Sequence, residues 1–149
     1  MEKQKYAAIV LAAGSGKRMN SQVHKQYLII QDRPVLYYSL KEFQDSAVDE
    51  IVLVVGKGEE EFCRREIVDK YGISKVKAIV EGGKERYHSV FEGLKQTSDA
   101  DYVLIHDGAR PFVDEPMLER VYADVCKYEA CVVGMPVKDT IKIADTDGF

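Results

Sequence analysis

The sequence is poor in several features that define large classes of protein. Only three of its 149 residues are cysteines (Cys63, Cys126 and Cys131), and no two of them form a Cys-x-x-Cys pair. Their odd number and spacing argue against a disulfide framework and against a zinc site, so we expect the cysteines to be small, buried hydrophobic residues.

Long hydrophobic segments are also missing. No apolar run approaches the ~20 residues that span a bilayer, and the N-terminal stretch lacks the features of a signal peptide. We therefore expect a cytoplasmic protein without a membrane partner.

Positive charge is not in excess either. Lysine and arginine together number 21 against 25 acidic residues, which gives a formal net charge of -4. A nucleic-acid-binding protein normally carries a basic stripe or a strongly basic composition, so we expect no nucleic-acid partner. The composition still allows a small anionic ligand that is held by a few local cations.

With 46% hydrophobic residues, the chain is able to bury one core, and we expect one domain over residues 1–149.

Apolar runs rich in β-branched residues alternate with amphipathic stretches, a pattern typical of parallel strands joined by helices. It predicts an α/β fold with a doubly wound, mostly parallel sheet. Gly72 is expected to end the second helix and Asp114 to cap the fourth. The expected strands are Tyr6–Ala12, Glu50–Gly56, Val76–Val80, Tyr102–His106 and Cys131–Val137. The expected helices are Val35–Gln44, Glu59–Tyr71, Glu85–Gln96 and Glu115–Tyr128.

The end of the sequence has the pattern of an unfinished hairpin. Residues 139–144 resemble a strand, and the Asp-Thr-Asp-Gly run at 145–148 resembles the turn of a hairpin. No returning strand follows the turn. We therefore expect the domain to be incomplete at its C-terminus, with the chain ending inside a hairpin arm.

A glycine-rich segment, residues 11–19, follows the first expected strand directly. Gly14 and Gly16 allow a backbone to approach a phosphate closely, and exposed N–H groups there can form an anion nest. Lys17, Arg18 and Lys25 add cations, so the segment predicts a polyphosphate site. A plain structural turn is the alternative.

Two familiar nucleotide motifs do not fit this segment. A P-loop requires glycine at position 11 and serine or threonine at position 18, where the chain has Leu11 and Arg18. A dinucleotide fingerprint requires a third glycine at position 19, where the chain has Met19.

A second cluster joins the third strand to the third helix. Gly82 and Gly83 are able to expose backbone groups to the edge of a base, and Ser89 to hydrogen-bond that base. The alternative is an ordinary loop in which Arg86 forms a salt bridge to the sheet.

A third cluster, residues 106–112, ends the fourth strand. Asp107 is placed to hold a hydrated Mg²⁺ between triphosphate oxygens, and Arg110 to bind a second phosphate through its guanidinium fork. In the alternative interpretation, Asp107 and Arg110 pair with each other. Thr140, after the fifth strand, is a candidate for a substrate hydroxyl or phosphate, unless it only favours a strand.

Other polar residues are expected to be structural. The histidines His24, His88 and His106 lack metal-ligand spacing, so we expect structural or surface roles for them. The acidic run at residues 59–61 is interpreted as the first turn of a solvated helix.

Taken together, the segments LAAGSGKRM, HKQYL, GGKERYHSV, HDGARPFV and PVKDT resemble one family, in order and in spacing. This family is the 2-C-methyl-D-erythritol 4-phosphate cytidylyltransferases of non-mevalonate isoprenoid biosynthesis. The resemblance implies a Rossmann-like nucleotidyltransferase fold and a Mg²⁺-dependent reaction of CTP with methylerythritol phosphate that releases pyrophosphate. It also implies a homodimer joined through arms.

The resemblance also implies roles for individual residues. Those implied for the triphosphate site are Ala12, Ala13, Gly14, Gly16, Arg18 and Lys25, of which Arg18 and Lys25 are expected to be catalytic. Gly83 and Ser89 are implied near cytosine. Asp107, Arg110 and Thr140 are implied to face the methylerythritol phosphate, with Asp107 also near the metal, directly or through water.

The chain departs from the family pattern in a few places. Val23 and His24 stand where a proline commonly precedes the lysine, and Lys84 stands where the base loop can be acidic. Similar enzymes continue for roughly another half of this length. Two alternatives remain open: a cytidylyltransferase for another sugar-alcohol phosphate, such as ribitol 5-phosphate, and a nucleotide-binding module without catalytic activity.

Overall fold

The computed structural model describes residues 4–14, 24–97 and 99–142. Its elements come in the order β1 (Tyr6–Ala12), a 3-10 helix (Lys25–Tyr27), β2 (Ile29–Ile30), β3 (Arg33–Pro34), α1 (Val35–Asp45), β4 (Glu50–Val55), α2 (Glu60–Cys63), a π-helix (Arg64–Asp69), β5 (Val76–Glu81), α3 (Arg86–Leu94), β6 (Tyr102–Asp107) and α4 (Glu115–Tyr128). Strands and helices alternate, as the sequence predicts.

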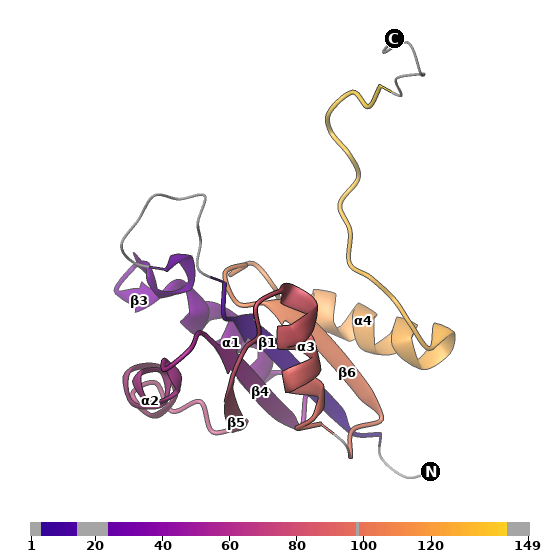
Figure 1. Ribbon diagram of the computed structural model, residues 1–149. Helices are drawn as coiled ribbons and strands as arrows, with labels where there is room; N and C mark the ends of the chain where they lie inside the picture. The colour runs from indigo at the N-terminus through magenta and orange to yellow at the C-terminus, as the bar shows by residue number, and fades with distance from the viewer. Residues whose placement is uncertain (1–3, 15–23, 98, 143–149) are drawn as a thin grey trace.

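The main sheet has four parallel strands in the order β5-β4-β1-β6 (Figure 1). The chain leaves β1 on one side to form β4 and β5, and then returns to the other side to form β6. The strand order therefore reverses beside β1, which is the switch point of a doubly wound fold. This arrangement confirms the predicted α/β fold class.

Alternate residues of the strands face opposite sides of the sheet, and both sides are covered. Ala8 and Val10 belong to the larger core cluster, which also includes residues of α1, α2, the π-helix and α4. Ile9 belongs to the smaller cluster on the face that α3 covers, and Figure 1 shows α3 in front of the sheet with α1 and α4 behind it. A Cβ added to Gly93 of α3 would lie 2.6 Å from Ile9 Cγ2, so this glycine allows close helix–sheet packing.

Most predicted elements agree with the structure to within a few residues, and two predicted helix boundaries have the expected cause. Gly72 has a φ of +64° where the second helical segment ends, which glycine adopts without strain. The Asp114 carboxylate accepts a hydrogen bond of 2.9 Å from the backbone N–H of Met117 and so caps α4.

The prediction of a strand at Cys131–Val137 is wrong. These residues are irregular and exposed, and the stretch that follows α4 runs away from the sheet (Figure 1). A strand is stabilised by hydrogen bonds and side-chain contacts with a neighbour, and no strand is paired with this segment in the part of the chain that the structure describes.

Two further expectations are corrected. The helix expected over residues 59–71 is a short α-helix that widens into a π-helix. Cys63 is buried as expected, but Cys126, near the end of α4, and Cys131, three residues beyond it, are exposed. As for membranes, none of the described helices combines the length and apolar character needed to cross one.

Candidate nucleotide-binding site

The carboxyl ends of the strands lie level with one another, and three of the predicted clusters begin there. Leu11 of β1 is paired with Asp107 of β6, and Ala12 is paired with Val55 of β4. Val55 is in turn paired with Glu81, the last residue of β5. The loops after β1, β5 and β6 therefore leave the same edge of the sheet, which is where ligands bind in open α/β folds.

The loop after β5 lies directly against the loop after β1. A Cβ added to Gly82 would lie 2.5 Å from Ala13 Cβ and 2.6 Å from Ser89 Oγ. Only glycine fits between these two atoms without displacing one of them. The contact brings the glycine-rich loop and the expected base-binding loop together, as the sequence predicts.

Ser89 is buried at the start of α3, where its hydroxyl organises the loop before it. The hydroxyl oxygen accepts a hydrogen bond of 3.2 Å from the Gly83 N–H, and the hydroxyl lies 3.4 Å from the Glu85 carbonyl, to which it donates. The side chains of Glu85 and His88 form a reciprocal capping box at the same helix start. His88 is thus structural, as expected, and its partner Glu85 sets the shape of the loop.

Asp107 pairs with two arginines at once. Its Oδ1 accepts hydrogen bonds from Arg86 Nε (3.1 Å) and Nη2 (3.0 Å), while its Oδ2 lies 3.1 Å from Arg110 Nε. The pairing of Asp107 with Arg110 and a salt bridge from Arg86 to the sheet were the alternatives in the sequence interpretation, and both are present. Asp107 thereby links the second and third clusters and places two guanidinium groups side by side.

These contacts limit the ability of Asp107 to bind the expected magnesium ion. Both carboxylate oxygens of Asp107 are engaged by guanidinium groups. Within residues 4–14, 24–97 and 99–142, no three His, Cys, Asp or Glu residues form a group that could hold a metal ion. The described residues as they stand therefore do not fit a protein-built cage for Mg²⁺.

The turn that carries Arg110 is fastened to the body of the protein. The Arg110 carbonyl accepts hydrogen bonds of 3.0 Å from Ser39 Oγ on α1 and of 3.0 Å from His106 Nε2. The Gly108 N–H donates to the Leu11 carbonyl at 2.8 Å. Burial lowers the pKa of His106 below its usual 6.5, which favours the neutral imidazole that donates through Nε2. His106 is structural, as expected.

Lys25 reaches the same edge on the 3-10 helix. Its side chain is exposed, and it forms no ion pair with any of the residues that the structure describes. The next residue, Gln26, is only 3% exposed, and its Nε2 donates to the carbonyls of Ala12 (2.6 Å) and Gly14 (3.3 Å). The structure therefore places an exposed cation beside the beginning of the glycine-rich loop.

Comparison with known proteins gives one consistent family. The family model described as 2-C-methyl-D-erythritol 4-phosphate cytidylyltransferase matches residues 6–149. Curated proteins of that name from Lachnoclostridium phytofermentans and Clostridium kluyveri are 52% and 51% identical over 146 and 143 residues. The chain belongs to this family.

A solved structure of a family member supports the fold assignment. The crystal structure of 4-diphosphocytidyl-2C-methyl-D-erythritol synthase from Anaerococcus prevotii has a TM-score of 0.82 and 33% sequence identity, and the match covers 98% of this chain and 61% of that one. The matches cover 98% and 95% of this chain and 63% and 62% of the two curated relatives. The chain thus spans less than two thirds of the length of these family members.

Three of the expected site residues are not among the described residues at the carboxyl edge of the sheet. Gly16 and Arg18 lie outside the described residues. Thr140 lies in the exposed stretch that leads away from the sheet after α4 (Figure 1). The described residues that gather at the carboxyl edge of the sheet are Ala12, Ala13, Gly14, Lys25, Gly83, Ser89, Asp107 and Arg110. The binding and catalytic roles of all the expected site residues stay predictions.

Two residues that matter at this edge were not recognised from the sequence. Gln26 was not singled out, and Glu59 was interpreted as part of a solvated helical turn. Glu59 instead accepts hydrogen bonds from Tyr27 Oη (2.7 Å) and from the Gly56 N–H (3.0 Å). A polar residue between a lysine and a tyrosine gives no signal of burial, because the 3-10 helix that turns it inward is too short to show a periodicity.

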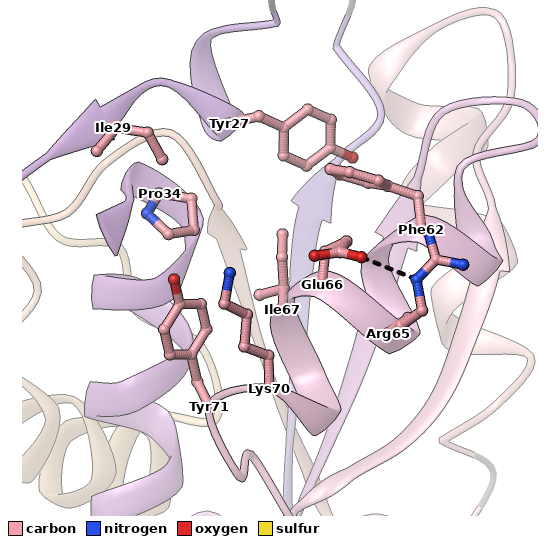
Figure 2. A pocket seen from close by; sticks show the side chains of 9 residues that line it. All are labelled: Tyr27, Ile29, Pro34, Phe62, Arg65, Glu66, Ile67, Lys70 and Tyr71. Atoms are coloured by element: carbon pink, nitrogen blue, oxygen red, sulfur yellow. Dashed lines mark hydrogen bonds and ion pairs between the residues drawn. The ribbon is translucent and has the colours of Figure 1, made fainter. Parts of the chain in front are cut away.

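A shallow hollow lies beside the 3-10 helix, between the β2–β3 hairpin and the π-helix (Figure 2). Its volume is about 260 Å³. Tyr27 and Phe62 line one end, with their ring centroids 5.3 Å apart in an edge-on contact. Tyr27 therefore belongs both to this hollow and to the helix that carries Lys25.

Proposed function

We propose that this chain is the nucleotide-binding part of an enzyme that joins CTP to 2-C-methyl-D-erythritol 4-phosphate. The products are 4-diphosphocytidyl-2-C-methyl-D-erythritol and pyrophosphate, in non-mevalonate isoprenoid biosynthesis. The observation that carries the proposal is the convergence of the three loops and Lys25 at one edge of the sheet. Membership of the family agrees with it. A cytoplasmic location, where CTP is available, belongs to the same proposal.

The proposed reaction is an in-line displacement at phosphorus. An oxygen of the methylerythritol phosphate forms a bond to the α-phosphorus of CTP. The bond from that phosphorus to the oxygen bridging to the β-phosphate breaks, and pyrophosphate leaves with the electron pair. The attacking phosphate oxygen is already ionised at neutral pH, so the reaction requires no side-chain nucleophile and no general base.

The protein has to align two anions that repel each other and to stabilise the additional negative charge of the transition state. Backbone N–H groups of the glycine-rich loop and the cations Arg18 and Lys25 suit the triphosphate. Gly83, in the loop after β5, and Ser89, in the first turn of α3, are the residues proposed near cytosine. Arg110 is suited to the acceptor phosphate because its guanidinium is oriented by Asp107.

We include Mg²⁺ in the proposal as an ion that binds together with the triphosphate and offsets its negative charge. Proteins commonly hold Mg²⁺ through one or two carboxylates together with substrate phosphates. Asp107 is the carboxylate that the resemblance implies near the metal, but both its oxygens are engaged by arginines. A metal contact at Asp107 therefore requires that it release one guanidinium, unless the contact passes through water.

The proposal is tested by measuring pyrophosphate release with CTP and Mg²⁺. The acceptors are methylerythritol phosphate, ribitol 5-phosphate and none. We expect release with methylerythritol phosphate at least ten times faster than with the other two. Faster release with ribitol 5-phosphate would reassign the acceptor, and saturable CTP binding without any release would show a nucleotide-binding module. Light scattering of the purified chain tests the homodimer that the resemblance implies.

A further inference from the structure

Lys25 is exposed, but the residues on both sides of it are anchored. His24 and Tyr27 contact Glu59, the residue just before α2, and Gln26 contacts the loop after β1. We propose that Gln26 and Glu59 are positioning residues that clamp the 3-10 helix and so hold Lys25 beside the triphosphate site. This inference rests on the function proposed above and adds two residues to that site.

Gln26 forms the inner half of the clamp. Its Nε2 carries two protons, and the two carbonyls within reach are those of Ala12 and Gly14, at 2.6 and 3.3 Å. Because the side chain is only 3% exposed, water does not replace these bonds readily. The glutamine amide therefore ties the first residues of the glycine-rich loop to the helix that carries Lys25, across 12 to 14 positions of sequence.

Glu59 forms the outer half of the clamp. Its Oε2 accepts from Tyr27 Oη at 2.7 Å and from the Gly56 N–H at 3.0 Å, and its Oε1 lies 3.0 Å from His24 Nδ1. A Cβ added to Gly56 would lie 2.7 Å from Oε2, so the close approach of the carboxylate depends on that glycine. One carboxylate thereby connects both ends of the 3-10 helix to the loop after β4.

The hydroxyl of Tyr27 stays protonated, as its hydrogen bond to Glu59 requires. Burial is the main cause that raises the pKa of its phenol, which keeps the hydroxyl protonated and able to donate to Glu59. The ring packs edge-on against Phe62 of α2, as Figure 2 shows. The tyrosine is thus fixed by its hydroxyl and by its ring at the same time.

The clamp determines where the backbone that carries Lys25 is held. A lysine side chain is flexible and acts as a point charge, so its average position depends on where its own Cα is held. In reactions that depend on alignment, a displacement of about 1 Å costs roughly 10²-fold in rate. The two halves of the clamp fix this Cα relative to β1 and β4, whose ends border the proposed site.

The first experiment replaces Gln26 by methionine, which keeps the length of the side chain but removes both donors. We expect kcat for pyrophosphate release to fall roughly 10- to 100-fold, with the KM for the acceptor unchanged within about twofold. The matched control is Gln96→Met, at an exposed position in the turn after α3, and it should turn over at the wild-type rate. Equal rates for the wild type and Gln26→Met would overturn the proposal.

A double-mutant cycle separates positioning from general structural damage. If Gln26 acts through Lys25, then Gln26→Met should cause almost no further loss of kcat in the Lys25→Ala background. Independent losses that multiply in the double variant would reject a role through Lys25.

A second pair of variants tests the outer half of the clamp. These are Glu59→Gln and, as its control, Glu61→Gln at an exposed position nearby. We expect Glu59→Gln to lower kcat for pyrophosphate release less than Gln26→Met does, because the amide oxygen still accepts one hydrogen bond.

Amide hydrogen exchange gives a readout that does not depend on activity. We expect exchange in peptides covering residues 24–28 to be at least ten times faster in Gln26→Met and unchanged in Gln96→Met. If the wild-type chain releases no pyrophosphate, the proposed function fails, and the exchange data still decide whether the clamp exists. Unchanged exchange in Gln26→Met would show that Gln26 does not hold the helix.

Discussion

The strand β4 and the segment Cys131–Val137 have similar sequences and different structures. Both are rich in valine, and both were expected to be strands of the sheet. Every residue of β4 is buried between paired neighbours β1 and β5, whereas residues 131–137 are exposed and irregular. The comparison shows that β-branched composition produces a strand only where a partner supplies hydrogen bonds and packing. The site residues divide in a related way, because Asp107 lies in the paired strand β6 and Lys25 lies on a 3-10 helix anchored to the end of β1, whereas Thr140 lies in the exposed stretch.

The largest effect on activity is expected at Lys25, on the anchored 3-10 helix. Lys25→Ala should lower kcat for pyrophosphate release by about 10²–10³-fold, because removing one donor to a developing charge typically costs that much. Thr140→Val, tested beside it, asks whether the extended segment takes part at all. The fold of both variants is checked by circular dichroism. A near-normal rate for Lys25→Ala would remove this residue from the catalytic group.

A matched pair of valines tests the structural side of the comparison. Val54 of β4 is completely buried, and Val133 is 56% exposed. Val54→Ala should reduce the free energy of unfolding by about 2 kcal/mol, since it loses two buried methyl groups and leaves a cavity. Val133→Ala should change it by less than about 0.5 kcal/mol. Urea unfolding of the two variants measures both values, and similar losses would show that residues 131–137 are packed in solution.

An intermediate effect on activity is expected when the carboxylate of Asp107, which pairs with two arginines, is removed. Asp107→Asn removes the charge that orients Arg86 and Arg110, so we expect the KM for the acceptor phosphate to rise roughly tenfold. Asp124→Asn, on the exposed part of α4, is the control. Magnesium titrations of the same variant examine the metal expectation separately. A rise in the Mg²⁺ requirement without a change in acceptor KM would favour metal binding by Asp107 over orientation of the arginines.

The smallest effect is expected from His106, which supports the loop after β6. Burial lowers the pKa of His106 below 6.5 in the folded state, so the unfolded chain binds its proton more readily. The stability contributed by the neutral imidazole is therefore complete above about pH 6.5 and is lost as the pH falls towards the folded-state pKa. The decline in unfolding free energy between pH 7 and 5 should be shallower in His106→Gln than in the wild type. Parallel declines would contradict this assignment.

The sequence predicted the positions of β1, β4, β5 and β6, and of α1, α3 and α4, from local patterns alone. It also predicted which loops carry the site, because parallel strands must end at one edge. It did not reveal that Asp107 binds two arginines, since Arg86 comes from a helix 21 positions away. Nor did it show that Gln26 and Glu59 anchor the residues on either side of Lys25, because these contacts join parts of the chain that are distant in sequence.

What the sequence by itself determined is the alternation of strands and helices and the kinds of side chain that meet at the edge of the sheet. Hydrophobic periodicity, capping residues and glycines act over a few positions, so they can be recognised in one segment at a time. Only the tertiary structure decided which valine-rich segment became a strand and which polar side chains were drawn inward to hold Lys25. Those outcomes depend on partners distant in the chain, because burial and hydrogen bonding are satisfied between elements and not within them.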